Sequence, residues 1–182
     1  MSVWIIVLII IVVVVALVIV TFNGLITLKN RVQEAASDID VQLKRRYELI
    51  PGLINSVKGY AKHEAAIYAD ITNKREGLLK GTTADKIAAS NQLQDALKSI
   101  LMLQESNPEL KADATFLDLM AQLTDTQDKI MYSQRFYNAN VRDFNTKLQV
   151  FPTNIYGKQL GFTEFEYIEA AESEKQNVKV EF

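Results

Sequence analysis

The start of the chain constrains the fold more than any other feature. Every residue from Val3 to Val20 is apolar, and no charged side chain occurs before Lys29. At a rise of about 1.5 Å per residue, a helix of this length spans roughly 27 Å, close to the thickness of a bilayer's hydrocarbon core. Many of these residues are β-branched, but a lone segment in lipid satisfies its backbone hydrogen bonds only as a helix. The run therefore predicts a transmembrane helix.

The flanks of this run predict how the anchor, residues 1–28, is placed. Only Met1 and Ser2 precede the run, without the basic region of a cleaved signal peptide, so we expect an anchor that is retained. Basic residues follow it at positions 29, 31 and 44–46. The positive-inside rule then predicts that the C-terminal part of the chain lies in the cytoplasm. A periplasmic location remains the alternative, because few charges decide the orientation of a single span. The residues expected to span the bilayer include Val3, Trp4, Ile10, Val15 and Val20.

Composition excludes most familiar site chemistries. The 182 residues include no cysteine and one histidine, which excludes disulfides, thiol nucleophiles and metal sites that need two imidazoles. That histidine, His63, precedes a glutamate as in zinc metalloproteases, but Ile67 stands where the second histidine is required. With 20 basic and 22 acidic residues the net charge is −2, so no basic field favours nucleic acid. We expect no catalytic residue, metal, cofactor or nucleic-acid partner.

Apolar spacing predicts long helices after the span. A stripe with steps of three and four residues runs from Leu25 to Ala61 and shifts phase near Ile39. Pro51 lies inside this stretch and lacks a backbone donor, so we expect a kink or break near residues 48–52. Two helices and one bent helix both remain open. The second helical stretch reaches about Lys80, where a Gly-Thr-Thr connection follows.

Two further helices complete the predicted all-α fold. The third covers residues 84–105 and places Leu101 in the core. Asn107 and Pro108 then predict a helix start, because an Asn side chain can cap free amides and proline suits the first helical position. The fourth helix has the most regular apolar period, with alternating steps of four and three that are typical of a coiled-coil seam. We therefore expect an N-terminal transmembrane helix that continues into an antiparallel bundle of about four long helices.

The predicted seam for packing and self-association comes from the first and fourth helices. Its residues are Val32, Ile39, Leu43, Phe116, Met120, Leu123, Gln127, Ile130, Gln134, Tyr137, Val141, Phe144 and Leu148. The two glutamines interrupt the apolar seam. Polar residues at such positions can fix the register of the helices or the number of subunits. The equally weighted alternative is that both glutamines face a hydrated edge of a four-helix bundle.

A short basic run lies on the predicted first helix. Lys44, Arg45 and Arg46 fan around this helix without interleaved aromatics, which favours a solvated face over contact with anionic lipid or a partner.

We expect the bundle to occupy residues 29–162 and a tail to occupy residues 163–182. Within that tail, residues 163–174 fit a short helix, and residues 178–182 alternate in the manner of a strand.

Several long segments resemble the bacterial LemA family, and the resemblance covers nearly the whole chain. They are Ile39–Glu64 (IDVQLKRRYELIPGLINSVKGYAKHE), Glu105–Phe116 (ESNPELKADATF) and Arg135–Phe162 (RFYNANVRDFNTKLQVFPTNIYGKQLGF). Gly52 departs from the asparagine that family members often carry. The resemblance implies a single N-terminal span in the bacterial inner membrane, a long-helix bundle and no established enzymatic activity. Relatives include a protein involved in forming magnetosome membranes, which implies membrane shaping or scaffolding.

The leading hypothesis is therefore a non-enzymatic protein that is anchored in the lipid bilayer and self-associates as a homo-oligomer to scaffold or remodel it. The competing hypothesis is an adaptor that presents its bundle to another membrane protein, such as a protease or sensor.

Overall fold

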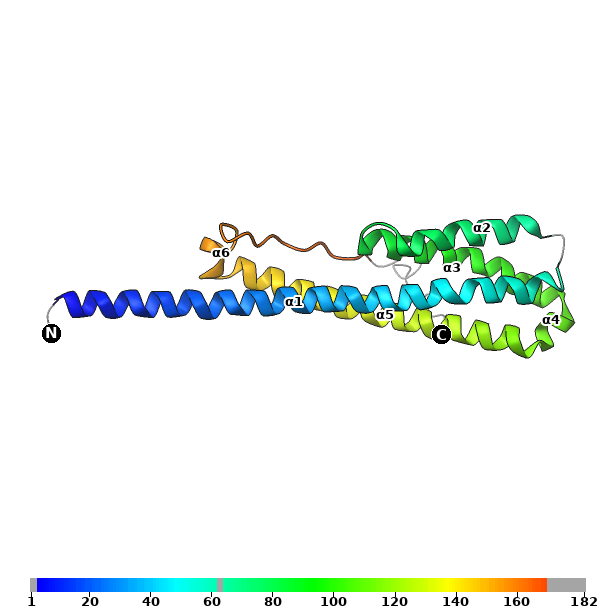
Figure 1. The fold of residues 1–182 in the computed structure, drawn as a ribbon, viewed down its shortest axis with the longest axis horizontal. Coiled ribbons are helices and arrows are strands. Elements are labelled where there is room, and N and C mark those ends of the chain that lie inside the picture. Colours follow the sequence, from blue (N-terminus) through cyan, green and yellow to red (C-terminus); the bar gives the residue numbers. More distant parts are fainter. Residues whose placement is uncertain (1–2, 62–63, 170–182) are drawn as a thin grey trace, which may run out of the picture. The chain divides into compact units, whose positions relative to one another are not determined.

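The computed structural model describes residues 3–61 and 64–169, and this part of the chain is all-α, as predicted (Figure 1). The helices are α1 (Val3–Lys58), α2 (Ala65–Glu76), α3 (Thr83–Ser106), α4 (Pro108–Ala112), α5 (Ala114–Gln149) and α6 (Thr153–Tyr156), with a 3₁₀ turn at Gly77–Leu79. No strand occurs among the described residues.

The chain divides into two compact units, and the two longest helices contribute to both. The first unit combines α1 up to Ala35 with residues 135–167. The second unit combines residues 36–134 with the described end of the chain from Ile168. The predicted boundary at residue 28 thus falls inside α1, because the apolar run passes into the amphipathic stripe without a helix-ending signal.

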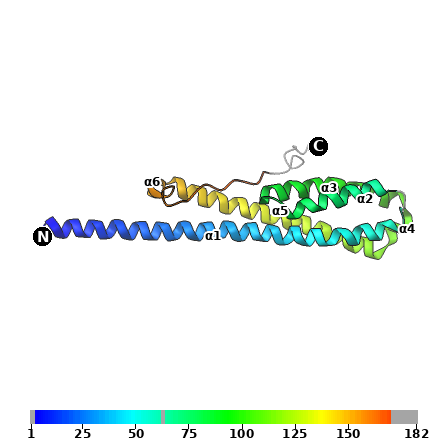
Figure 2. The ribbon, with the colours of Figure 1, turned by 45° about the horizontal axis from the view of Figure 1, so that its top comes forward.

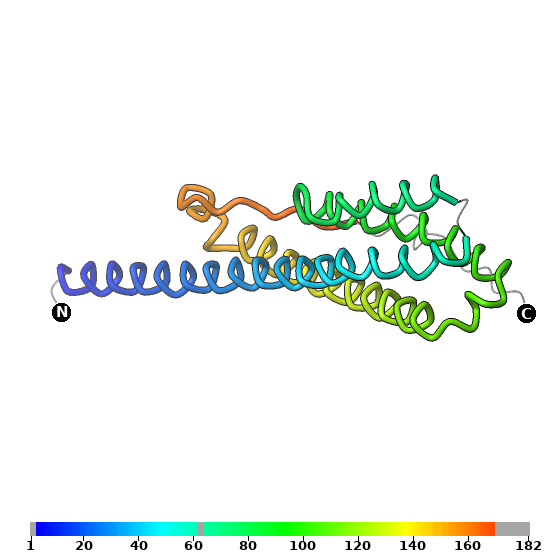
Figure 3. The backbone as a smooth tube through the Cα atoms, turned by 45° about the vertical axis from the view of Figure 1, so that its right-hand side comes forward, coloured from blue at the N-terminus to red at the C-terminus, as the bar shows by residue number. Residues whose placement is uncertain are grey.

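The second unit is a bundle of four helices. Four helical segments lie side by side in all three views: α2, α3, the later part of α1 and the early part of α5 (Figures 1, 2 and 3). Thr82 and Asp85 form a capping box that begins α3, and Gly81 before it has a φ of +86°, which favours glycine. The buried core includes Ile39, Leu43, Ile50, Leu53, Val57, Ile71, Leu93, Ile100, Phe116, Leu123 and Ile130.

In the first unit, the chain turns back after α5 and contacts α1 at Thr21 and Phe22, part-way along that helix (Figure 2). After α6 the chain is extended and returns along α5, where Asn145 exchanges two hydrogen bonds with the backbone of Phe165. The helix predicted for residues 163–174 is therefore wrong over 163–169, since Asn145 takes up these backbone groups instead. The remainder, with Val178, Val180 and Phe182, lies outside the described residues.

Of the two alternatives left open at the kink or break predicted near residues 48–52, the structure has a single helix, because α1 continues through Pro51 to Lys58. Two other local expectations need correction. Asn107 and Pro108 begin α4 as predicted, but the Asn107 side chain caps no amide of that helix, because its Nδ2 donates to the carbonyl of Leu103 in α3 at 2.7 Å. Leu101 was expected in the core but is 42% exposed.

Candidate functional site: an apolar helix and two arginine clusters

The start of α1 carries a continuous apolar surface that nothing in the structure covers. The most hydrophobic window of this helix is 0% buried, and Trp4 is 82% exposed. Val3, Ile10, Val15 and Val20, which were predicted to span the bilayer, are exposed as well. An apolar surface of this extent requires an apolar environment, because single soluble chains rarely leave large contiguous apolar patches in water. The helix is long and apolar enough to cross a membrane, and it is a candidate transmembrane helix.

Arg46 lies at the centre of the second unit rather than on its surface. Its side chain is 0% exposed, so it cannot make the lipid or partner contact considered from the sequence. Its Nη1 donates to Ser90 Oγ at 2.7 Å and to Gln127 Oε1, and its Nη2 donates to Gln94 Oε1. One side chain of α1 is thereby bonded to α3 and α5. The sequence signal for burial is weak, because Arg46 is the end of a run of three basic residues.

The electrostatics of this cluster are unfavourable for a cation. The three acceptors of Arg46 are neutral, and its Nε is buried without a hydrogen-bond partner in the structure. Burial lowers the pKa of Arg46 to about 10, since desolvation disfavours the charged form. Gln94 and Gln127 supply the dipoles that compensate the charge. One of the two glutamines that interrupt the predicted seam therefore has a structural role inside the chain.

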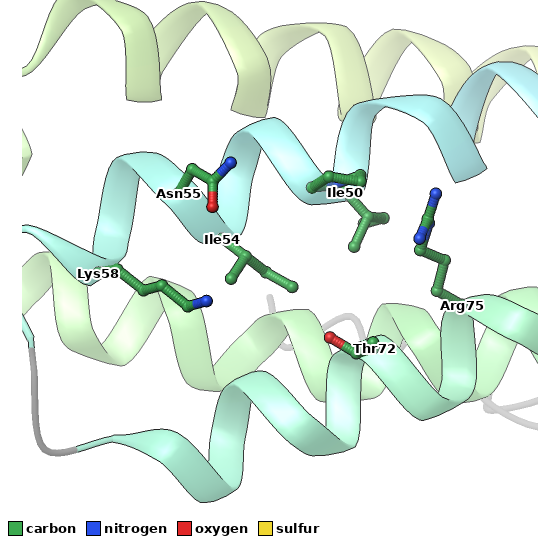
Figure 4. Close-up of a pocket in the computed structure, with 7 residues that line it drawn as sticks. Ile50, Ile54, Asn55, Lys58, Thr72 and Arg75 are labelled. Atoms are coloured by element: carbon green, nitrogen blue, oxygen red, sulfur yellow. The ribbon is translucent and has the colours of Figure 1, made fainter.

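A second arginine cluster explains why α1 does not break at Pro51. Proline has no amide hydrogen, so the carbonyl four residues earlier, that of Tyr47, lacks its helical donor. Arg75 of α2 supplies that donor, with its Nε 2.7 Å from the Tyr47 carbonyl oxygen. Its guanidinium carbon also lies 3.5 Å from the centre of the Tyr47 ring, a cation–π contact. Figure 4 shows Arg75 reaching from α2 towards α1.

The other two residues of the basic run have different environments. Arg45 is partly exposed, and its Nη1 lies 3.4 Å from Asp125 Oδ2 of α5. Lys44 is exposed. Asp40 of α1 pairs with Lys86 of α3 at 2.8 Å. Sequence reasoning missed the pairs formed by Arg45 and Asp40, because both join residues far apart in the chain.

The predicted seam residues lie largely within the chain. Val32, Ile39, Leu43, Phe116, Leu123, Ile130, Tyr137, Val141, Phe144 and Leu148 are buried, and Met120, Gln127 and Gln134 are half-buried. The first and second units each contain a share of them. Their side chains are thus committed to packing within a single protomer.

Two grooves in the described part of the second unit gather no set of reactive groups. One of about 170 Å³ lies between α1 and α2, beside Pro51 and Arg75 (Figure 4). Another of about 340 Å³ lies between α3 and α5, where Gln94 and Gln127 form part of the wall. Among residues 3–61 and 64–169, no three His, Cys, Asp or Glu side chains are grouped to hold a metal. His63 lies outside the described residues.

Comparison with known proteins identifies relatives of this architecture. A sequence model of the LemA family matches residues 35–182. Protein LemA of Metamycoplasma hominis is 29% identical, over 86% of this chain and 72% of that protein. Magnetosome protein MamQ of Magnetospirillum gryphiswaldense is 21% identical, over 80% of this chain and 64% of that protein. Magnetosome protein MamQ 2 of Paramagnetospirillum magneticum is 22% identical, over 81% and 64% respectively. None of these names is that of an enzyme.

Proposed function

Because this chain belongs to the LemA family, we propose that it is a non-enzymatic protein anchored in the bacterial inner membrane that holds a four-helix unit beside the bilayer. The observation that carries this proposal is the uncovered apolar surface at the start of α1. The same helix runs without interruption into the second unit, ending at Lys58. The apolar start of the chain and the second unit are thus joined by helical backbone.

The finer part of the proposal is that copies of the chain self-associate and thereby scaffold or remodel the membrane. Anchoring raises the local concentration of copies, so that weak lateral contacts add up. Because the seam residues pack within the protomer, contact between copies falls to exposed apolar side chains elsewhere. Leu101 and Met102 on α3, 42% and 68% exposed, are such residues. The magnetosome proteins among the relatives also support a role at membranes.

The second candidate is an adaptor that presents its bundle to a membrane protease or sensor. Its support is the open groove between α3 and α5, with Leu97, Met120 and Leu123 in its wall. A groove between two helices with apolar side chains in its wall is a common docking place for a partner helix.

The test is the mass of the full-length protein extracted with its native lipid, measured by mass photometry and negative-stain imaging. Self-association predicts large, regular particles, and a stable one-to-one complex with another protein would support the adaptor instead. A monomer under several gentle extraction conditions would overturn the scaffold proposal.

A variant pair makes this test specific to the proposed contact. Met102→Asp places a charge on the more exposed of Leu101 and Met102, outside the α3–α5 groove that Leu101 helps to line, and is expected to reduce particle mass. Gln92→Asp, at another exposed position of the same helix, is the matched control and should leave the mass unchanged. Circular dichroism of each variant shows whether the helices are retained.

A further inference from the structure

A turn in the first unit exposes a cluster of apolar side chains. Between the end of α5 and the extended segment, Val150, Phe151, Ile155 and Leu160 are 43%, 76%, 62% and 49% exposed. Across residues 150–161 the one charged side chain is Lys158. Solitary exposed apolar residues are ordinary, but four within a single turn suggest a contact surface. We call residues 150–161 the apolar turn.

Hydrogen bonds and close packing hold the apolar turn in a defined shape. Thr153 is buried, and its Oγ1 donates to the carbonyl of Val150 at 2.8 Å and to that of Lys147. The amide of Gly157 donates to the Thr153 carbonyl at 2.7 Å. A Cβ at Gly157 would lie 2.6 Å from a methyl carbon of Leu148, so only glycine allows this approach. The apolar side chains are therefore presented outward by a fixed backbone.

Contacts with α1 place the apolar turn at one end of the candidate span. The hydroxyl of Tyr156 forms a short hydrogen bond with Oγ1 of Thr21, the residue directly after the apolar run. The ring of Phe162 lies 5.6 Å from that of Phe22, in an edge-to-face arrangement. An 18-residue helix from Val3 to Val20 covers roughly 27 Å, so Thr21 falls near the edge of the hydrocarbon layer. The turn therefore lies at the level where headgroups meet acyl chains.

We propose that the apolar turn inserts into the interface of the bilayer that α1 crosses and forms a second membrane contact beside the span. This inference rests on the proposed anchoring of α1. A tyrosine with an apolar ring and a polar hydroxyl suits this depth, which is where membrane proteins concentrate their aromatic residues. Lys158 is exposed and carries the charge that pairs with lipid phosphates. Lipid is favoured over a protein partner because the turn is fixed to the helix at the depth of the interface.

The absence of cysteine from the chain allows a direct test with single fluorescent probes. Phe151→Cys carries an environment-sensitive nitrobenzoxadiazole dye, and so do Val15→Cys in the span and Val41→Cys, a 59% exposed position in the second unit. The full-length protein is reconstituted in vesicles of phosphatidylglycerol and phosphatidylcholine that contain nitroxide-labelled lipids. Phe151 is 76% exposed, so its replacement removes little packing, which circular dichroism verifies.

The expected result is a blue-shifted emission for the probe at position 151, with loss of intensity to nitroxides placed shallowly in the acyl chain. The probe at position 15 should lose more intensity to deep nitroxides, and the probe at position 41 should lose none. If position 15 is quenched and position 151 is not, the anchor stands and the inference is wrong. If position 15 is not quenched either, the anchoring itself fails. A blue shift at position 151 without quenching would show that protein covers the turn, which also overturns the inference.

Discussion

At the scale of single residues, the carbonyl of Tyr47 shows how one missing hydrogen atom is compensated from another helix. Pro51 removes the amide that would bond this carbonyl, and Arg75 replaces it. An unsatisfied, partly buried carbonyl costs about 1–3 kcal/mol. The continuity of α1 at this point therefore depends on a side chain of α2.

This dependence predicts a strong coupling between positions 51 and 75. Arg75→Met should lower the free energy of unfolding by about 2 kcal/mol, because it removes both the donor and the cation–π contact. In a Pro51→Ala background the new amide serves the Tyr47 carbonyl, and the same substitution should cost clearly less. Urea unfolding of the full-length protein in detergent, followed by circular dichroism, measures all four corners of this cycle. Equal costs in both backgrounds would show that Arg75 does not serve that carbonyl.

For the buried Arg46, unlike Arg75, we expect that removal of the arginine does not lower the free energy of unfolding. Gln94 is exposed and Gln127 half-buried, so both regain water if the guanidinium is removed. Replacing a buried ion by an apolar side chain of similar size is often neutral or stabilising. Arg46→Met should therefore leave the free energy of unfolding unchanged or raise it.

The matched variant keeps the charge of Arg46 and removes two of its three acceptors. Gln94→Leu with Gln127→Leu should lower the free energy of unfolding by about 3 kcal/mol, because the buried cation keeps only the Ser90 hydroxyl among these acceptors. Combined with Arg46→Met, the same pair should cost little. A large loss in the combined variant would mean that the glutamines act independently of Arg46.

At the scale of elements, the carboxylate of Asp113 caps the start of α5. Asp113 Oδ1 accepts from the amide of Phe116 at 2.8 Å, and Asp113 Oδ2 accepts from the hydroxyl of Tyr60. These hydrogen bonds hold the pKa of Asp113 below its ordinary value of 3.8, since both favour the ionised form. A carboxylate with a lowered pKa contributes stability above the unfolded-state value and loses it as the pH falls through the folded-state value.

The pH dependence of Asp113→Asn tests this cap. Asn keeps an acceptor but not the charge, so the variant should have a lower thermal unfolding midpoint than wild type at pH 7. The difference between the two midpoints should disappear below about pH 4, because the wild-type carboxylate is then protonated. Thermal unfolding followed by circular dichroism gives both midpoints. Asp128→Asn, an exposed position on the same helix, serves as control. A gap that persists in acid would assign the effect to something other than the charge.

The extended segment after α6 depends on Asn145, which is 6% exposed. Its Nδ2 donates to the Phe165 carbonyl at 2.9 Å, and its Oδ1 accepts the Phe165 amide at 3.0 Å. Asn145→Ala should accelerate hydrogen exchange at Phe165 roughly tenfold or more, because each lost bond contributes about 1 kcal/mol. Mass spectrometry of the segment measures the change. Gln149→Ala, which loses an exposed side-chain bond to Glu164, should have little effect.

These elements also show what the sequence could predict. The continuous apolar run predicted the candidate span. Apolar spacing predicted the helical class and the stripe of α5, because periodicity reports burial directly. It could not predict the continuity of α1, since Arg75 is distant in the chain from Pro51. The burial of Arg46 could not be predicted either, because it belongs to a basic run and its acceptors come from α3 and α5, which are distant in the chain. The extended course of residues 163–169 depends likewise on Asn145, which local propensity does not include.

At the scale of the whole molecule, the basic residues at 29, 31 and 44–46 predict that the chain after the candidate span lies in the cytoplasm. With no native cysteine, Val41→Cys and Ser2→Cys report the two sides of the span. In intact cells, with the outer membrane permeabilised, an impermeant maleimide should label position 2 but not position 41. Labelling at 41 should require disruption of the inner membrane. The reverse pattern would place the second unit in the periplasm.

The pairing of Arg75 with the Tyr47 carbonyl makes the shape of α1 conditional on the attachment of α2. While α2 is docked, the helix has its missing donor and continues through Pro51. Any partner that drew α2 away would remove that donor and leave α1 free to bend at this residue, where proline already weakens it. Displacement of a peripheral helix would thus be converted into a change of angle within the longest helix of the protein.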